Sequence, residues 1–129
     1  MRQLVFIACA SLLMVSCADK GSAPTVGSVS CTPMTLTVAQ QTSVTCSVMF
    51  EDADGDLDSV HIQFVDPAAM SVTSDAAVAG VAGVRAGTAT VTLLLQPTMV
   101  GAAQLHVNVV DVQGNASNVV TSAFDCVTP

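Results

Sequence analysis

The sequence contains no tryptophan and no tyrosine, and its four phenylalanines are its only aromatic residues. Aromatic side chains usually supply much of a core's buried area, so valine, leucine and isoleucine have to fill most of this interior. Charge is also scarce, with three basic residues against ten acidic ones and a formal net charge of -7. Because no basic patch is present to neutralise phosphates, nucleic acid is not an expected partner.

Long hydrophobic runs are missing beyond the N-terminus. The first run, from Leu4 to Val15, follows the basic Arg2 and is interrupted only by Ser11. It is too short to span a bilayer and has the length of the apolar core of a signal peptide. We therefore expect residues 1–16 to be a signal peptide and the mature chain to be exported.

The end of this run, Met14-Val15-Ser16-Cys17, resembles a bacterial lipobox, in which small residues precede a cysteine. The resemblance implies that the Cys17 thiol receives a diacylglyceryl group and that cleavage makes this cysteine the first mature residue. Residues 17–26 would then be the lipidated cysteine and a flexible tether, since the stretch ADKGSAPT is small and polar. The alternative is ordinary cleavage after Ser16-Cys17-Ala18, which would discard the cysteine.

A lipidated Cys17 determines the expected location. Its acyl chains would anchor the protein in the membrane of the cell envelope. The next residue is Ala18 rather than aspartate. In enteric bacteria this permits transfer outward, so we expect the outer membrane or cell surface rather than the inner membrane.

Beyond the tether, apolar residues alternate with polar ones, the pattern of half-buried strands. The alternation is found in Val44–Phe50, Val60–Phe64, Val91–Leu95 and Leu105–Val109, and a last strand is indicated by Val120, Phe124 and Cys126. Two short pieces separated by Pro33 precede these strands, and the alanine- and glycine-rich segment 66–87 predicts one more near Val78–Val84. About seven strands in residues 27–129 predict an all-β, antiparallel two-sheet sandwich.

Three stretches resemble bacterial immunoglobulin-like domains: CTPMTLTVAQQTSVTCSV at 31–48, EDADGDLDSVHIQF at 51–64 and VGAAQLHVNVVDVQGNAS at 100–117. The resemblance implies a single immunoglobulin-like β-sandwich, and such sandwiches have many different roles. Many relatives carry a tyrosine near the start of the sixth strand. It is absent here, so the corner that it normally ties must be held by other residues.

With Cys17 acylated, three cysteines remain in an oxidising compartment: Cys31, Cys46 and Cys126. The immunoglobulin-like resemblance implies a disulfide between Cys31 and Cys46. A plain hairpin turning at residues 40–41 would place Cys31 opposite Phe50, so this pairing requires Pro33 to shift the register. An inter-sheet bridge between Cys46 and Cys126 is the competing prediction. No C-x-x-C motif activates a thiolate, which favours a structural disulfide over redox catalysis.

Acidic residues are concentrated at Asp52, Asp54, Asp56 and Asp58. Crowded carboxylates favour a hard cation with oxygen ligands, which makes Ca²⁺ the candidate cofactor. The stretch does not match an EF-hand, because glycine falls at position four and Gln63 at position twelve. A solvated turn is the competing interpretation. The immunoglobulin-like topology would place Asp111 and Asn115 at the same end, so the candidate calcium ligands are Asp52, Asp54, Asp56, Asp58, Asp111 and Asn115.

The two histidines, His61 and His106, are expected on the outer faces of neighbouring strands. If Asp58 lies level with Asp111, the two imidazoles are almost opposite each other. Two histidines form only a weak Zn²⁺ or Cu²⁺ site, so exposed polar residues on a sheet are the preferred interpretation.

No enzyme is expected, because the sequence has neither a nucleophile elbow nor a pair of carboxylates in an apolar setting. We predict a non-enzymatic, membrane-anchored binding or structural module with an unknown protein or glycan partner. One alternative is a calcium-dependent adhesion or glycan-binding module. A second is a small metal- or redox-active envelope protein that uses His61, His106 or Cys126.

Overall fold

The structure, a computed structural model, describes residues 21–78 and 81–129. The predicted signal peptide and Cys17 lie outside these residues. The described residues form eight strands: β2 (Thr25–Thr32), β3 (Thr35–Thr37), β4 (Thr42–Glu51), β5 (Leu57–Val65), β6 (Ser71–Ala77), β7 (Ala86–Leu95), β8 (Gly101–Asp111) and β9 (Val120–Val127). They contain no helix with the length and apolar character needed to cross a membrane.

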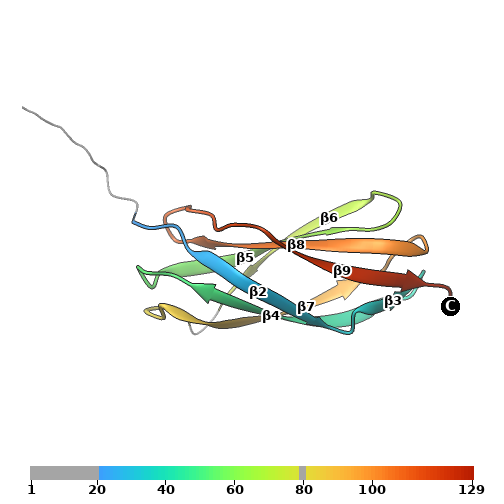
Figure 1. The fold of residues 1–129 in the computed structure, drawn as a ribbon, viewed down its shortest axis with the longest axis horizontal. Helices are drawn as coiled ribbons and strands as arrows, with labels where there is room; N and C mark the ends of the chain where they lie inside the picture. The colour runs from blue at the N-terminus through green and yellow to red at the C-terminus, as the bar shows by residue number, and fades with distance from the viewer. Residues whose placement is uncertain (1–20, 79–80) are drawn as a thin grey trace, which may run out of the picture.

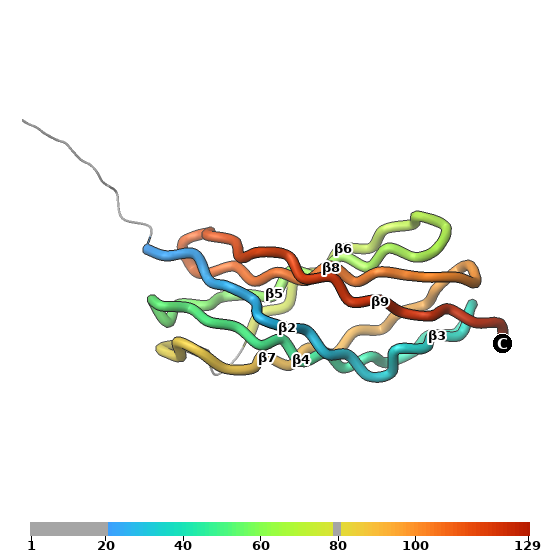
Figure 2. Tube along the Cα trace, in the orientation of Figure 1, coloured from blue at the N-terminus to red at the C-terminus, as the bar shows by residue number. Residues whose placement is uncertain are grey.

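The strands form two packed sheets, as Figure 1 shows. One sheet has the order β2-β4-β7 and the other has the order β3-β9-β8-β5-β6. Every pairing is antiparallel except that of β3 with β9. The predicted all-β immunoglobulin-like sandwich is confirmed, and the described chain begins at one end and finishes at the other (Figure 2).

The core lies between the sheets and is aliphatic, as the shortage of aromatic residues predicts. Strand β4 shows the alternation most clearly, since Val44, Cys46, Val48 and Phe50 are buried between exposed or half-buried polar residues and Met49. Valines from facing strands complete the interior, with Val60 on β5 and valines of β8 fully buried. One edge-to-face aromatic pair, Phe64 with Phe124, adds to the packing at a centroid distance of 6.2 Å.

Pro33 divides the first strand and sends its two halves to different sheets. Strand β2 pairs with β4, whereas β3 pairs with β9 of the other sheet. The hairpin at residues 40–41 therefore does not fix the register of β2, and Cys31 lies directly opposite Cys46. The two cysteines form a disulfide with a Cα–Cα distance of 4.0 Å. The competing bridge to Cys126 does not form, and this cysteine is free and buried.

The prediction of a strand near Val78–Val84 is wrong. The strand of this region is β6, which pairs with β5 from Ser71 to Ala77. The described residues that follow form a loop, in which Gly83 adopts a φ of 77°. Val81 is buried, and Val78 and Val84 pack against the core. The apolar residues of this loop thus cover the end of the core without forming a strand.

The tether predicted for residues 17–26 ends too late. Thr25 and Val26 belong to β2, and the side chain of Val26 is buried. Asn118 holds this part of the strand, because its side chain accepts from the Val26 backbone N–H at 2.9 Å and donates to the Val26 carbonyl at 3.0 Å.

The corner without a tyrosine is held by Asp66 and Thr98. The Thr98 hydroxyl and backbone N–H both donate to Asp66 Oδ2. Asp66 follows β5 and Thr98 follows β7, so this contact joins loops from the two sheets. A buried carboxylate thus ties the loop that follows β7.

Candidate functional site

The acidic residues gather at one end of the sandwich, which we call the acidic apex. It consists of the loop Asp52–Asp56 after β4, the loop Asp111–Asn115 after β8, and residues 21–22. Figure 1 shows these loops at the left-hand end, beside the start of β2. Val112 N donates to the Asp56 carbonyl at 2.9 Å and joins the loops directly. The prediction that both loops share one end is confirmed.

Two aspartates of the apex, Asp52 and Asp111, are buried, and each accepts hydrogen bonds from the backbone of its own loop. Asp52 accepts from the backbone N–H of Asp54 at 3.3 Å and of Asp56 at 2.9 Å. Asp111 accepts from the N–H groups at positions 113 and 115, at 3.0 and 2.8 Å. Gly55 has a φ of 65°, a backbone conformation that glycine adopts without steric cost. These two carboxylates are therefore structural parts of the apex.

A cluster of three carboxylates stands out within the apex. Single oxygen atoms of Asp52, Asp54 and Asp56 all lie within 4.8 Å of one another. Asp56 Oδ1 is buried and has no hydrogen-bond partner. Burial raises the pKa of the Asp56 carboxyl, and the contact with Asp52 and the charges of Asp111, Asp52 and Asp54 act in the same direction. A cation would relieve this repulsion.

The N-terminal residues of the described chain contact the same cluster. Ser22 N donates to Asp54 Oδ2 at 2.6 Å, so the chain leaves the domain directly beside the carboxylates. The described chain therefore begins at the acidic apex.

Of the other predicted calcium ligands, the carboxylates Asp58 and Asp111 are not part of the cluster of Asp52, Asp54 and Asp56 in the described part of the chain. Asp58 is exposed and lies at a register shift between β5 and β8, which separates it from the loop. Asn115 donates its side-chain N–H to Asp111 Oδ2 at 3.0 Å. Asp111 contributes charge near Asp56, while its oxygens accept from its own loop.

The two histidines lie on paired strands but are not direct cross-strand partners. His61 pairs with Asn108 and His106 pairs with Gln63, so the two rings are diagonal neighbours. Leu57 pairs with Asp111 while Ser59 pairs with Val110, so the register shifts between them. From Ser59 onward the register is the one that would place Asp58 level with Asp111, and in it the two histidines are offset by two positions. The sequence pattern gave no sign of this irregularity.

Each histidine has a hydrogen-bonding partner of its own. His61 Nδ1 contacts the Asp75 carboxylate on β6, and His106 Nδ1 lies 2.9 Å from the Thr121 hydroxyl on β9. Sequence reasoning missed Asp75 because it placed the strand of this region further along the chain. Within residues 21–78 and 81–129, no group of three possible metal ligands includes either ring.

Cys126 is a poor candidate for redox chemistry. Its side chain is 2% exposed, and burial raises the pKa of its thiol. A buried thiol with a raised pKa forms little thiolate, which is the reactive species.

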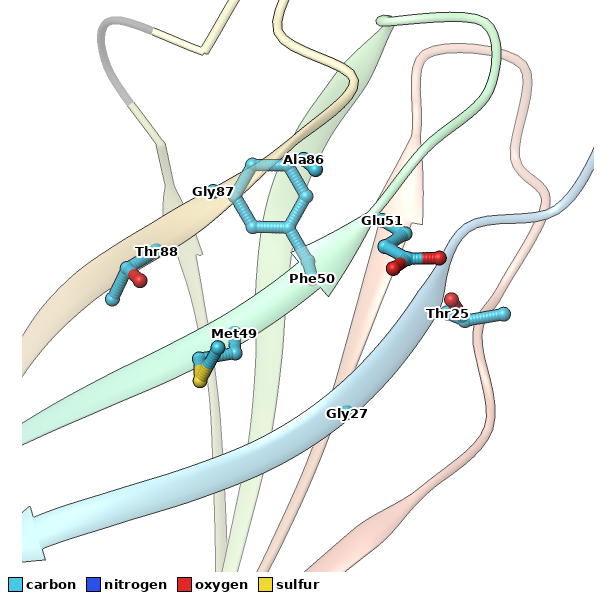
Figure 3. A pocket seen from close by; sticks show the side chains of 8 residues that line it. All are labelled: Thr25, Gly27, Met49, Phe50, Glu51, Ala86, Gly87 and Thr88. Atoms are coloured by element: carbon cyan, nitrogen blue, oxygen red, sulfur yellow. The ribbon is translucent and has the colours of Figure 1, made fainter.

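A groove that sequence reasoning also missed lies next to the apex. It has a volume of about 490 Å³ and is lined by Thr25, Gly27, Met49, Phe50, Glu51, Ala86, Gly87 and Thr88 (Figure 3). Gly27 and Gly87 contribute no side chains, and β2 has an irregular register at Gly27. In Figure 3 the Glu51 carboxylate and Thr25 stand on one side and Met49 and Thr88 on the other. Two glycines on strands that flank β4 are the sequence signal for this hollow.

Comparisons with known proteins identify the fold. No protein-family profile matches the chain, and no curated protein matches it by sequence. Among solved structures, the PKD domain of an M14-like peptidase from a Thermoplasmatales archaeon is similar, with a TM-score of 0.54 and 16% identity over 81% of this chain and 92% of that one. A Niemann-Pick type C2 protein from the Japanese carpenter ant has a TM-score of 0.55 and 7% identity over 82% of this chain and 94% of that one.

The sporulation control protein Spo0M from Bacillus subtilis is also similar, with a TM-score of 0.51 and 12% identity over 81% of this chain and 49% of that one. These proteins have different roles at low identity, so the likeness describes architecture alone. The chain is an all-β domain with a sandwich like that of PKD and immunoglobulin-like domains.

Proposed function

We propose that this protein is an exported, lipid-anchored, non-enzymatic module of the bacterial cell envelope, whose immunoglobulin-like domain binds a partner at the acidic apex. The observation that carries the proposal is the direct bond between the two apex loops at Val112 and Asp56, next to the point where the N-terminal chain leaves. A rigid sandwich that presents tied loops at one end is suited to recognition.

The chemistry of the apex also supports binding over catalysis. Asp52 and Asp111 are held by backbone N–H groups of their own loops, so neither carboxylate is positioned as a general acid or base toward an open pocket. Asp54 of the apex and Glu51, which directly precedes the apex loop, remain exposed, and they give this end a negative surface that suits a basic or neutral partner.

The anchoring part is tested by acyl labelling of the wild type and of Cys17→Ser in producing cells. Label in the wild type and none in the variant supports the lipid anchor, whereas persistence of label in the variant contradicts it.

The binding part is tested with a photo-crosslinking residue at Asp54 and a matched one at Ser43, which is exposed near the opposite end. Adducts specific to position 54 are expected; equal labelling at both positions rejects the apex as the contact surface.

A second candidate function is a calcium-dependent adhesion or glycan-binding module. The unpartnered Asp56 Oδ1 within the three-carboxylate cluster favours it. Melting the purified domain in EDTA and then in excess Ca²⁺ tests this candidate, because ligand at a hundred times its Kd stabilises by about 2.7 kcal/mol. Asp56→Asn should abolish the rise, and Asp58→Asn, outside the cluster, should retain it. An unchanged midpoint in the wild type rules out the calcium candidate.

A further inference from the structure

The three-stranded sheet ends in a strand whose outer edge pairs with no strand of the described residues. This strand is β7, which has ten residues and pairs with β4 without interruption from Ala86 to Leu95. The free side of an edge strand presents backbone N–H and C=O groups that can pair with another strand. The first residues of β7 lie beside the loop at Val84, so the open part of the edge is Ala89–Leu95.

The other sheet edges carry features that discourage such pairing. Strand β2 has an irregular register between Val26 and Ser28. Strand β3 is only three residues long, and β6 carries the exposed Asp75. Short length, bulges and charges are the usual protection of an edge. Strand β7 has none of them, because its sequence AGTATVTLLL contains neither a charge nor a proline and its register is unbroken.

An apolar groove lies directly beside this edge, between the two sheets. It has a volume of about 430 Å³ and is lined by Ile62, Phe64, Val72, Thr73, Ser74, Thr92, Leu93, Leu94 and Leu95. Val72 pairs with the buried Phe64 and so faces the interior, yet its side chain is 63% exposed. The reason is the unequal width of the sheets, since three strands face five. The smaller sheet therefore leaves Val72 uncovered next to the free edge of β7.

We propose that the β7 edge from Ala89 to Leu95 binds an extended segment of another protein as a fourth strand of the smaller sheet. The segment would carry apolar side chains at every second position, and these would fill the groove over Val72 beside Leu93. Backbone pairing supplies the affinity in this binding mode and the groove supplies the selectivity. The surface is separate from the acidic apex, so the inference does not depend on the function proposed for the apex.

The net charge of the chain and the contact area at the β7 edge favour a segment of another protein over a second copy of the domain. None of the groove residues is charged, whereas the whole chain has a net charge of -7. A second copy of the domain would bring two such charges together. Seven residues of edge at about 3.4 Å each give a contact about 24 Å long and about 10 Å wide, well below the roughly 800 Å² per partner of a stable dimer. A segment without acidic residues avoids the repulsion and also enters the groove.

The experiment titrates the purified domain, residues 17–129 with Cys17→Ser, with a decapeptide of alternating valine and threonine between terminal lysines. Amide chemical shifts should change in β7 and β6 while the apex stays unchanged. Leu93→Lys places a charge in the groove, and Thr90→Lys places the same charge on the outer face of the same strand, away from the residues that line the groove. We expect Leu93→Lys to weaken binding by at least about tenfold and Thr90→Lys by less than about twofold. Val72→Lys repeats the test at a more exposed position.

Three results overturn the proposal: no shift changes at millimolar peptide, equal binding by Leu93→Lys and Thr90→Lys, or a peptide with the same composition but no alternation binding equally well. Sedimentation of the domain alone tests whether a second copy of the domain pairs with the β7 edge. Concentration-dependent dimers that Leu93→Lys disrupts would assign the edge to a second copy instead. Failure at the β7 edge leaves the crosslinking result at Asp54 unaffected, so the two proposals are tested separately.

Discussion

At the scale of single residues, three buried aspartates each organise a loop in the same way. Asp52, Asp66 and Asp111 lie at or just after the end of a strand, and each accepts from the backbone N–H groups two and four residues later. The residue three positions later has a positive φ in every case: Gly55, Ala69 and Gly114. Aspartate side chains stabilise turns by such local bonds. The DADGD and DVQGN stretches thus have a structural role that does not require a metal.

Of these three residues with a positive φ, Ala69 is the one that carries a side chain. Its φ of 64° is a backbone conformation that side chains disfavour. Ala69→Gly should stabilise the domain by about 0.5 to 1 kcal/mol, because glycine adopts this region without steric cost. The matched change Gly114→Ala, at a φ of 88°, should destabilise it. Urea unfolding measures both, and a loss of stability in Ala69→Gly would contradict the explanation.

The Asp66–Thr98 contact should make stability depend on pH. The hydrogen bond from the Thr98 hydroxyl holds the pKa of Asp66 below its usual value of 3.8. A lowered pKa stabilises the fold above the unfolded value, and this contribution is lost as pH falls through the folded value. Thr98→Val should therefore cost about 1 to 2 kcal/mol at pH 7 and less below about pH 4. Urea unfolding at both pH values checks this; an equal cost at both would show that Asp66 is not involved.

At the scale of strands, the Cys31–Cys46 disulfide joins β2 to β4 within one sheet. The pairing was implied by resemblance, and the division of the first strand at Pro33 makes it geometrically possible. It closes a loop with a sequence separation of 15 and lies at the middle of β4. The disulfide compensates for the limited area of a small sandwich core.

The double variant Cys31→Ala, Cys46→Ala should lose about 3 kcal/mol of unfolding free energy, the value expected for a loop of this length. Urea unfolding of the variant, and of the reduced wild type, measures the loss. Thiol counting in denaturant provides the control, because the non-reduced domain with Cys17→Ser should show the single thiol of Cys126. A second free thiol would mean that the disulfide does not form.

At the scale of the whole molecule, charge is segregated at the acidic apex while the core is neutral and aliphatic. The chain has a net charge of -7, with three basic residues against ten acidic ones. The electrostatic cost of crowding the apex carboxylates falls mainly on Asp56, where burial and three neighbouring aspartates favour the protonated form. The apex is therefore the part of the molecule where binding and pH act most directly on stability.

The raised pKa of Asp56 gives a prediction opposite in sign to that for Asp66. A raised pKa contributes stability at low pH that is lost as pH rises through the folded value. In EDTA, Asp56→Asn should melt above the wild type at pH 7, and the difference should shrink toward pH 4 as the wild-type carboxyl is protonated. Thermal melts across this range measure it, with Asp58→Asn as the control. A lower midpoint for Asp56→Asn at pH 7 would contradict the raised pKa.

Sequence patterns determined the fold because burying one face of a sheet imposes alternation on each strand. The alternating runs at residues 44–50, 60–64, 91–95 and 105–109 all lie in strands. The pattern failed for β6, whose residues are mostly exposed on both faces, so alternation carries no signal there. The apolar residues at 78–84 misled the prediction because they are buried from a loop.

The sequence by itself determined the all-β architecture, the aliphatic core and the clustering of acids near residues 52–58, because composition and periodicity are local properties. Tertiary structure alone decided which carboxylates meet, how far the two histidines are offset and which strand edge stays open. These depend on the register of the strands and on the unequal width of the two sheets, and both arise from pairing between residues far apart in the chain.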